Sequence, residues 1–210
     1  MDPYDITFKT WNKIAGLYEE YFMDLDLYND TYNYFVDNLE GGSNLLELGC
    51  GPGNICRYLI NKNPDLEILA TDIAPNMLER VQKNVPSAKV RLLDARNLNQ
   101  LQQTFDGIIA GFCIPYLSQN DCRKLMKDAF ELLNSKGLFY FSFLEGDYSL
   151  SAYESGSSGD KTFVYYHSIL FFEEELDKNN FKLLKHFKKD YKKRDGSSQL
   201  HHIFVARKQV

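Results

Sequence analysis

The chain has few cysteines and no long apolar run, and each shortage excludes a class of protein. Its four cysteines form no CxxC pair and are accompanied by only four histidines. This pattern fits reduced thiols better than disulfides or a zinc site, so we expect no bound metal and a cytoplasmic location. No window approaches the roughly 18 consecutive apolar residues that a membrane-spanning helix needs. We therefore expect no membrane partner.

A strong excess of positive charge is also missing. The chain has 24 Lys and Arg against 29 Asp and Glu, a formal net charge of -5. This balance argues against a protein whose whole surface meets nucleic acid or an anionic bilayer, although it leaves a local basic face open. Residues 185–194, "KHFKKDYKKR", form such a local run. We interpret it as an edge strand whose lysines prevent pairing with other sheets, and we keep nucleic-acid binding as the alternative.

Aromatic residues, in contrast, are abundant: 14 Tyr and 15 Phe in 210 residues. The surplus indicates an aromatic core or an aromatic-lined pocket, and the length is that of one α/β domain. We expect a single domain over residues 1–210. Its parts are a helical segment (1–43), a core that carries the main site (44–145), a loop insertion (146–160), and a helix with a hairpin (161–210).

Hydrophobic periodicity predicts the order of the elements. Apolar residues at helical spacing predict one or two amphipathic helices within residues 10–39, which "EGGSN" (40–44) ends. Strands and helices then alternate, which predicts a mostly parallel sheet covered on both faces. The expected strands are 45–48, 66–71, 90–93, 105–112 and 138–144, and the expected helices are 53–62, 75–84 and 119–133.

The remaining part of the chain closes this sheet. A Gly/Ser-rich segment, 145–160, is predicted to be a loop of unusual length. An extended arm over 162–168 and a helix over 171–180 follow it. Two strand-like runs joined around Asp195-Gly196 predict a final hairpin, in which the last strand runs antiparallel to the sheet.

A glycine loop follows the first expected strand, in "NLLELGCGPGN" (44–54). Gly49, Gly51 and Gly53 give GxGxG, whereas a dinucleotide fingerprint requires GxGxxG and a phosphate loop requires Gly-Lys-Ser/Thr. Glu47, two residues before the loop, would repel a pyrophosphate and attract a cation, an interaction worth about 1 kcal/mol or more. The loop therefore favours a ligand whose non-nucleoside half is cationic or zwitterionic.

Two further acids end the next two strands. Asp72 lies 23 residues after Gly49, and Asp94 lies 22 residues after Asp72. Because the carboxyl ends of parallel strands meet at one edge of a sheet, these acids should converge. The position of Asp72 fits a carboxylate that accepts hydrogen bonds from ribose hydroxyls, with capping of the helix at Pro75 as the alternative. Asp94 and Ala95 would lie where an adenine amino group could donate.

These motifs together resemble the S-adenosylmethionine-binding core of the class I methyltransferases. "FDGIIAGFCIPYL" (105–117) and "LLNSKGLFYFSF" (132–143) resemble the fourth and fifth strands of that family. "WNKIAGLYEEYF" (11–22) resembles the aromatic helical segment that closes over the cofactor in many members. The resemblance implies a Rossmann-like three-layer α/β sandwich with a seven-stranded, mostly parallel sheet whose last strand is antiparallel. It also implies S-adenosylmethionine as the cofactor.

The resemblance assigns cofactor contacts residue by residue. The loop glycines would hold the methionine part, Asp72 the ribose, and Asp94 the adenine edge. The full set of implied cofactor-binding residues is Tyr18, Glu47, Gly49, Cys50, Gly51, Gly53, Asp72, Ile73, Met77, Asp94, Ala95, Gly111 and Phe112.

No catalytic residue follows from the motifs. "IPYL" (114–117) stands where many relatives carry a His-containing turn. His167, expected near the mouth of the pocket, and its neighbour Tyr166 are the candidates for an acid/base role.

The hypothesis from sequence is methyl transfer from S-adenosylmethionine to a small-molecule acceptor by in-line displacement. Catalysis would consist mainly of positioning, because the methyl group arrives activated. The alternatives are an RNA or protein methyltransferase, or a cofactor-binding protein without turnover. Neither the acceptor nor the oligomeric state follows from the sequence.

Overall fold

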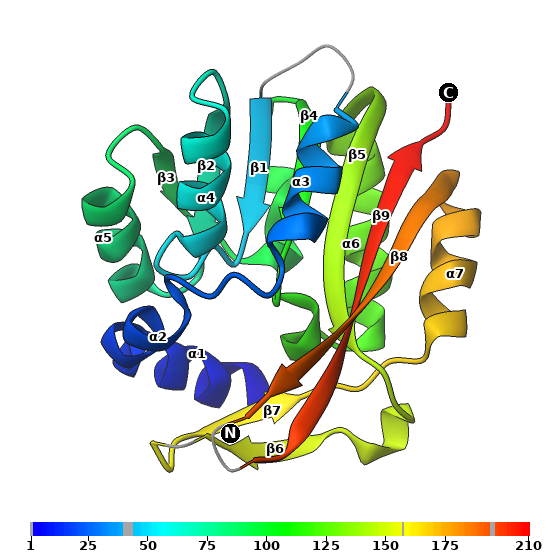
Figure 1. The fold of residues 1–210 in the computed structure, drawn as a ribbon. Coiled ribbons are helices and arrows are strands. Elements are labelled where there is room, and N and C mark those ends of the chain that lie inside the picture. Colours follow the sequence, from blue (N-terminus) through cyan, green and yellow to red (C-terminus); the bar gives the residue numbers. More distant parts are fainter. Residues whose placement is uncertain (1, 40–43, 157, 194–195) are drawn as a thin grey trace.

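A seven-stranded sheet forms the centre of the molecule (Figure 1). The computed structural model describes residues 2–39, 44–156, 158–193 and 196–210. The strand order is β3-β2-β1-β4-β5-β9-β8. The strands are β1 (Asn44–Leu48), β2 (Glu67–Asp72), β3 (Lys89–Leu92), β4 (Phe105–Ala110), β5 (Leu133–Leu144), β8 (Phe181–Lys192) and β9 (Ser198–Lys208).

The pairing of these strands confirms the predicted fold class. All neighbours from β3 to β5 pair in parallel, whereas β9 is antiparallel to both β5 and β8. Two parallel strands can be joined only by a crossover connection, so helices alternate with these strands along the sequence. These helices are α4 (Asn54–Lys62), α5 (Pro75–Asn84) and α6 (Gln119–Leu132), with α7 (Ile169–Lys178) before β8.

Helices cover both faces of the sheet, as the alternation of apolar side chains along the strands requires. In β1, Leu45 packs in a cluster with α3 (Asn29–Asp37), α4 and α5, whereas Leu46 and Leu48 pack in a cluster with α6 and α7. Helix α6 shows the local cause: Ser118 caps its first turn by accepting from the Asp121 N–H. Its buried residues, Cys122, Leu125, Met126 and Ala129, recur at helical spacing. The result is a three-layer sandwich.

The N-terminal segment contains three helices instead of the one or two predicted. They are α1 (Pro3–Lys13), α2 (Ala15–Phe22) and α3. Helix α1 begins earlier than the periodicity indicated, because the Asp2 side chain accepts from the Tyr4 N–H and Pro3 occupies the first turn. In Figure 1, α1 and α2 lie below the sheet, at the edge where β1 ends. They therefore cover the place where the glycine loop begins.

Two boundaries differ from the prediction. Strand β5 begins at Leu133 instead of residue 138, because Leu133 pairs with Phe105 and the register then shifts before Gly107 pairs with Leu138. The segment 146–160 is not a plain loop either: it holds a short 3-10 helix (Tyr148–Leu150) and β6 (Ala152–Ser155), which pairs antiparallel with β7 (Lys161–Val164).

Two predictions fall partly on residues outside the described ranges. These are the helix break at 40–43 and the turn at Asp195. A short 3-10 helix (Ala95–Gln100) joins β3 to β4, and these two strands lie within a few residues of their predicted bounds. Among the described helices, none has the length and apolar character to cross a membrane.

A closely packed glycine in β4 tests the packing of α3 against the sheet. A Cβ added at Gly107 would lie 2.6 Å from Phe35 Cζ and 2.9 Å from Leu45 Cδ2. We expect Gly107→Ala to lower the free energy of unfolding by about 1–3 kcal/mol, measured by urea denaturation, because the added methyl group would overpack the core. Gly156→Ala is the control, since a Cβ there meets nothing within 4 Å. Equal stability of the two variants would contradict this packing.

Candidate functional site

The glycine loop after β1 turns the chain sharply into α4. Gly49, Gly51 and Gly53 have φ angles of 63°, 55° and 91°, in the left-handed region that side chains disfavour. Space is also limited, because a Cβ at Gly49 would lie 3.2 Å from Cys113 Cβ. The loop thus exposes backbone along one wall of a cavity, at the carboxyl edge of the sheet.

Asp72 joins this loop to the next strand. Its Oδ2 accepts from the Gly51 N–H at 3.0 Å, and its Oδ1 accepts from the Ala74 N–H at 2.8 Å. The residue is only 8% exposed, and burial raises the pKa of its carboxyl group to about 6 despite these hydrogen bonds. Asp72 therefore holds the turn before α5, whose N-cap is Ala74. Its carboxyl group lines the cavity and, with a pKa of about 6, is ionised at neutral pH.

Glu47 lies beneath the loop instead of facing the cavity. Its side chain is 1% exposed, and its Oε2 has no hydrogen-bond partner among the described residues. Burial, together with the nearby charge of Asp72, raises the pKa of the Glu47 carboxyl group to about 8, while a hydrogen bond from the Cys56 backbone partly offsets the increase. A direct contact between Glu47 and a bound cation is thus not part of this geometry.

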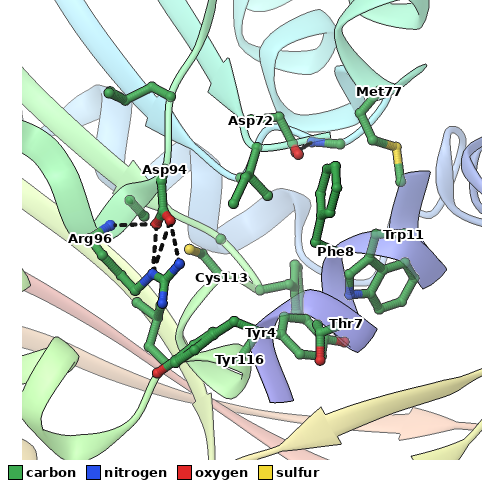
Figure 2. Close-up of a pocket in the computed structure, with 18 of the residues that line it drawn as sticks. Tyr4, Thr7, Phe8, Trp11, Asp72, Met77, Asp94, Arg96, Cys113 and Tyr116 are labelled. Carbon is green, nitrogen blue, oxygen red and sulfur yellow. Dashed lines mark hydrogen bonds and ion pairs between the residues drawn. The ribbon is translucent and has the colours of Figure 1, made fainter. Parts of the chain in front are cut away.

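Asp94 is already engaged by a residue that the sequence analysis missed. The Arg96 guanidinium binds its carboxylate in a fork, with Nε 2.9 Å and Nη2 2.6 Å from Asp94 Oδ2 (Figure 2). The same guanidinium stacks on Tyr4, with Cζ 3.9 Å from the ring centroid. Tyr4 in turn donates to Asp121, so the start of α1 is fixed to α6. The sequence offered one signal for this ion pair: Arg96 follows Asp94 by only two residues.

These groups surround one cavity at the carboxyl edge of the sheet. It brings together most of the predicted cofactor contacts: Tyr18, Gly49, Gly51, Asp72, Ile73, Met77, Asp94, Ala95, Gly111 and Phe112. Glu47, Cys50 and Gly53 do not line it. Residues from α1 that were not predicted also line it: Tyr4, Thr7, Phe8 and Trp11. The remaining lining residues are Leu93, Arg96, Cys113, Tyr116 and Leu117.

Helix α1 covers one side of this cavity. Phe8 projects from α1 into it and packs with Met77 (Figure 2). The volume is about 140 Å³, below the roughly 300–1,000 Å³ that is usual for ligand pockets. Polar contacts hold the helix in place: Thr10 Oγ1 donates to the Lys161 carbonyl at 2.6 Å, and the Asn76 N–H donates to Asn12 Oδ1 at 2.9 Å.

Phe112, directly after β4, has a strained backbone. Its φ of 61° is in the left-handed region, which is uncommon for a large side chain and occurs often at functional sites. The Phe112 N–H donates to Ser142 Oγ at 2.8 Å, which stabilises this conformation. Preceding it, Gly111 has no room for a side chain, since a Cβ would lie 2.4 Å from Ile55 Cδ1.

The two candidates for acid/base chemistry do not line the cavity. His167 is fully buried between aromatic rings, its Nε2 lies 3.1 Å from the Leu117 carbonyl oxygen, and burial lowers its pKa to about 4. The expectation that it lies at the cavity mouth does not match the structure. Tyr166 donates from its hydroxyl to Glu154 Oε1 at 2.6 Å and packs against Gly146, outside the cavity.

Comparisons with known proteins agree with this architecture. Residues 45–137 match the model of a family described as a methyltransferase domain. A malonyl-[acyl-carrier protein] O-methyltransferase of Bacillus anthracis is 33% identical over 100 residues, which are 47% of this chain and 36% of that protein. A demethylmenaquinone methyltransferase of Thermotoga maritima is 31% identical over 93 residues, 44% of this chain and 40% of that protein. The chain thus matches well under half of the length of these relatives.

Solved structures share the fold along the whole chain. Magnesium protoporphyrin IX methyltransferase from Synechocystis PCC 6803 with bound SAH superposes with a TM-score of 0.76 at 14% identity, over 99% of this chain and 100% of that one. The fold is that of a Rossmann-like α/β protein, with a cavity at the carboxyl edge of its sheet. Residues 45–137 are therefore similar to a methyltransferase domain, and the chain shares the fold of solved S-adenosylmethionine-dependent methyltransferase structures.

The buried carboxyl group of Glu47 makes a prediction about stability. Its folded pKa of about 8 exceeds the unfolded value, so the folded state holds a proton that the unfolded state has lost. The contribution of Glu47 is therefore fully present below about pH 4.5 and is lost as pH rises through 8, at about 1.4 kcal/mol per pH unit. We expect the stability of Glu47→Gln, relative to wild type, to increase steadily from about pH 5 to about pH 8 in urea denaturation.

The control is Glu67→Gln on the same sheet, where the side chain is 65% exposed. Its stability relative to wild type should stay nearly constant over that range, because solvent reaches the carboxylate in both states. If Glu47→Gln also ran parallel to wild type, the assigned burial of an unpaired carboxyl group would be wrong.

Proposed function

We propose that this chain transfers the methyl group of S-adenosylmethionine to a small-molecule acceptor. The observation that carries the proposal is the Asp72 carboxylate, which is ionised at neutral pH, anchored to Gly51, and directed at the cavity between the glycine loop and α1. Each Asp72 oxygen accepts one backbone N–H and keeps a lone pair for a further donor. A ribose diol supplies two such donors at the spacing of one carboxylate.

The other walls fit the rest of the cofactor. Ile73 is apolar yet 39% exposed at the cavity, where the flat face of an adenine would cover it together with Met77. Gly49 and Gly51 leave backbone accessible for the amino-acid part. In this proposal Glu47 acts through the loop that it supports, and Asp94 is held in place by Arg96.

The bound cofactor would supply an electrophilic methyl group on a positively charged sulfonium. The chain would contribute position and exclusion of water. Trp11, Tyr18 and Phe112 present aromatic rings at the end of the cavity beyond the glycine loop, and such rings stabilise a cation that lies over their faces. No histidine is among the described residues that line this cavity. In this proposal the chain acts by orienting the reactants, which can lower the activation barrier by about 7–11 kcal/mol.

Entry of the cofactor would require α1 to move. The cavity is smaller than usual for a ligand, and Phe8 fills part of it. Helix α1 is held mainly by side-chain contacts to β7 and α5, such as the Lys13–Asp160 ion pair at 2.8 Å, which is exposed and therefore weak. We infer that α1 opens, admits the cofactor and closes again over it.

The basic run supports the nucleic-acid alternative less than its charge suggests. Its residues 185–192 lie on β8, which is an edge strand of the sheet. Lys189 and Lys192 pair with Asp30 and Asp190 at 2.6 Å and 2.7 Å, respectively. This is the arrangement of an edge protected from pairing with another sheet. A steep salt dependence of RNA binding would favour the alternative instead.

The assignment of Asp72 is tested by binding of S-adenosylhomocysteine, measured by calorimetry. Wild type should bind, and Asp72→Ala should bind at least tenfold more weakly, a loss of about 1.4 kcal/mol or more, because the ribose donors lose their acceptor. Asp72→Asn, which keeps one acceptor oxygen for the loop, separates loss of the ribose contact from collapse of the loop. It should fold normally and still bind weakly.

Asp65→Ala, an exposed acid before β2, is the control and should bind as wild type does. No binding to wild type would refute the proposed function. Full affinity in Asp72→Ala would remove the ribose assignment alone.

A further inference from the structure

A second cavity adjoins the first and shares one wall with it. Trp11, Tyr18, Phe112 and Tyr116 line both cavities. Beyond these rings, the second cavity extends to the side chains of Tyr28 and the β9 residue His201. A molecule in the second cavity would therefore lie directly next to the aromatic rings at which the proposed cofactor site ends.

Aromatic rings surround the second cavity almost continuously. The centroids of Tyr18 and Phe22 are 4.4 Å apart, and those of Phe22 and Tyr191 are 6.1 Å apart. Tyr191 stacks on His201 at 5.5 Å with 19° between the planes, and His201 lies nearly parallel to Tyr28, at 5.9 Å and 6°. Such walls bind flat rings by stacked and edge contacts.

One side of the cavity is polar but uncharged. The Tyr28 hydroxyl and His201 Nδ1 are 2.7 Å apart, and Gln199 Oε1 is 3.5 Å from His201 Nε2. Burial lowers the pKa of His201 to about 4, and burial also raises the pKa of Tyr28 far above its usual range. Both side chains are thus neutral at physiological pH, and they offer a hydroxyl, an imidazole and an amide as hydrogen-bond partners.

No charged side chain lines this cavity among the described residues. A carboxylate or an ammonium group entering it would lose its hydration without meeting an opposite charge, which is costly. A hydroxyl or amino group could instead exchange its water for the side chains of Tyr28, His201 and Gln199 at little cost. The wall chemistry therefore favours a neutral ligand over an ion.

The size of the cavity restricts the ligand further. Its volume is about 160 Å³. A dry apolar cavity of about 150 Å³ holds one benzene molecule. One aromatic ring with small substituents fits this space as the structure has it.

We propose that the second cavity holds the methyl acceptor, an uncharged single-ring aromatic compound with a hydroxyl or amino group that Tyr28, His201 and Gln199 contact. This inference rests on the proposed methyl-transfer function, since it takes the first cavity as the cofactor site. It narrows the acceptor from small molecules in general to a chemical class that carries no carboxylate.

The test measures binding of three related rings to the complex of the protein with S-adenosylhomocysteine, by calorimetry. The probes are para-hydroxybenzamide, which is neutral, para-hydroxybenzoate, which has nearly the same shape but an anionic group, and tyramine, which is cationic. We expect para-hydroxybenzamide to bind at least tenfold more tightly than either ion. Tightest binding of para-hydroxybenzoate or of tyramine would overturn the proposal, the latter by indicating an aromatic cage for cations.

Two pairs of variants locate the binding site. Tyr28→Phe should weaken binding of para-hydroxybenzamide at least fivefold and leave S-adenosylhomocysteine binding unchanged. Tyr34→Phe, on the helix α3 that Tyr28 precedes but outside the cavity, should change neither. Leu25→Lys adds a positive charge to the wall and should shift the preference toward para-hydroxybenzoate, with Leu25→Met as its uncharged control. This second pair keeps the test decisive if Tyr28→Phe is unstable.

The outcomes separate the two claims. If S-adenosylhomocysteine binds and none of the three rings does, or if Leu25→Lys leaves the preference unchanged, the acceptor assignment fails and the methyl-transfer proposal stands. If S-adenosylhomocysteine itself does not bind, the proposed function fails first.

Discussion

The hydrogen bond between the Asp72 carboxylate and the Gly51 N–H is the contact on which the site depends. It ties the left-handed glycine loop to the end of the neighbouring strand, and thereby fixes the backbone that forms one wall of the first cavity. This contact requires a buried carboxylate, and burial raises the pKa of Asp72. The negative charge of Asp72 also contributes to the raised pKa of the neighbouring Glu47. A ligand that donates to Asp72 would offset part of this cost.

The N-terminal helices complete what the sheet begins. The sheet and its loops supply Asp72, the glycines and Asp94, but the opposite wall comes from α1, and the aromatic boundary between the two cavities comes from Trp11 and Tyr18. Helix α1 is held by one exposed ion pair, by a few side-chain hydrogen bonds and by the packing of Phe8 and Trp11. The same segment would thus control entry of the cofactor and shape the space for the acceptor.

Local spacing predicted the parts of the site that lie on one strand–loop–helix unit. The glycine loop and Asp72 follow from sequence because both come directly after apolar strands. Phe8 and His201 could not be found in that way, since their roles depend on tertiary packing. The prediction for His167 was wrong. An isolated β-bridge pairs the backbones of Glu145 and His167, and the His167 ring lies in the core. For an extended segment, the sequence does not determine which side chains face inward.

The most direct measurement of the central claim is a crystal structure of the protein with S-adenosylhomocysteine. The account predicts both ribose hydroxyls within hydrogen-bond distance of Asp72, the adenine over Ile73, and the sulfur facing the rings of Trp11, Tyr18 and Phe112. A ligand bound elsewhere, or ribose hydroxyls that contact other groups while Asp72 keeps only its bonds to Gly51 and Ala74, would contradict it.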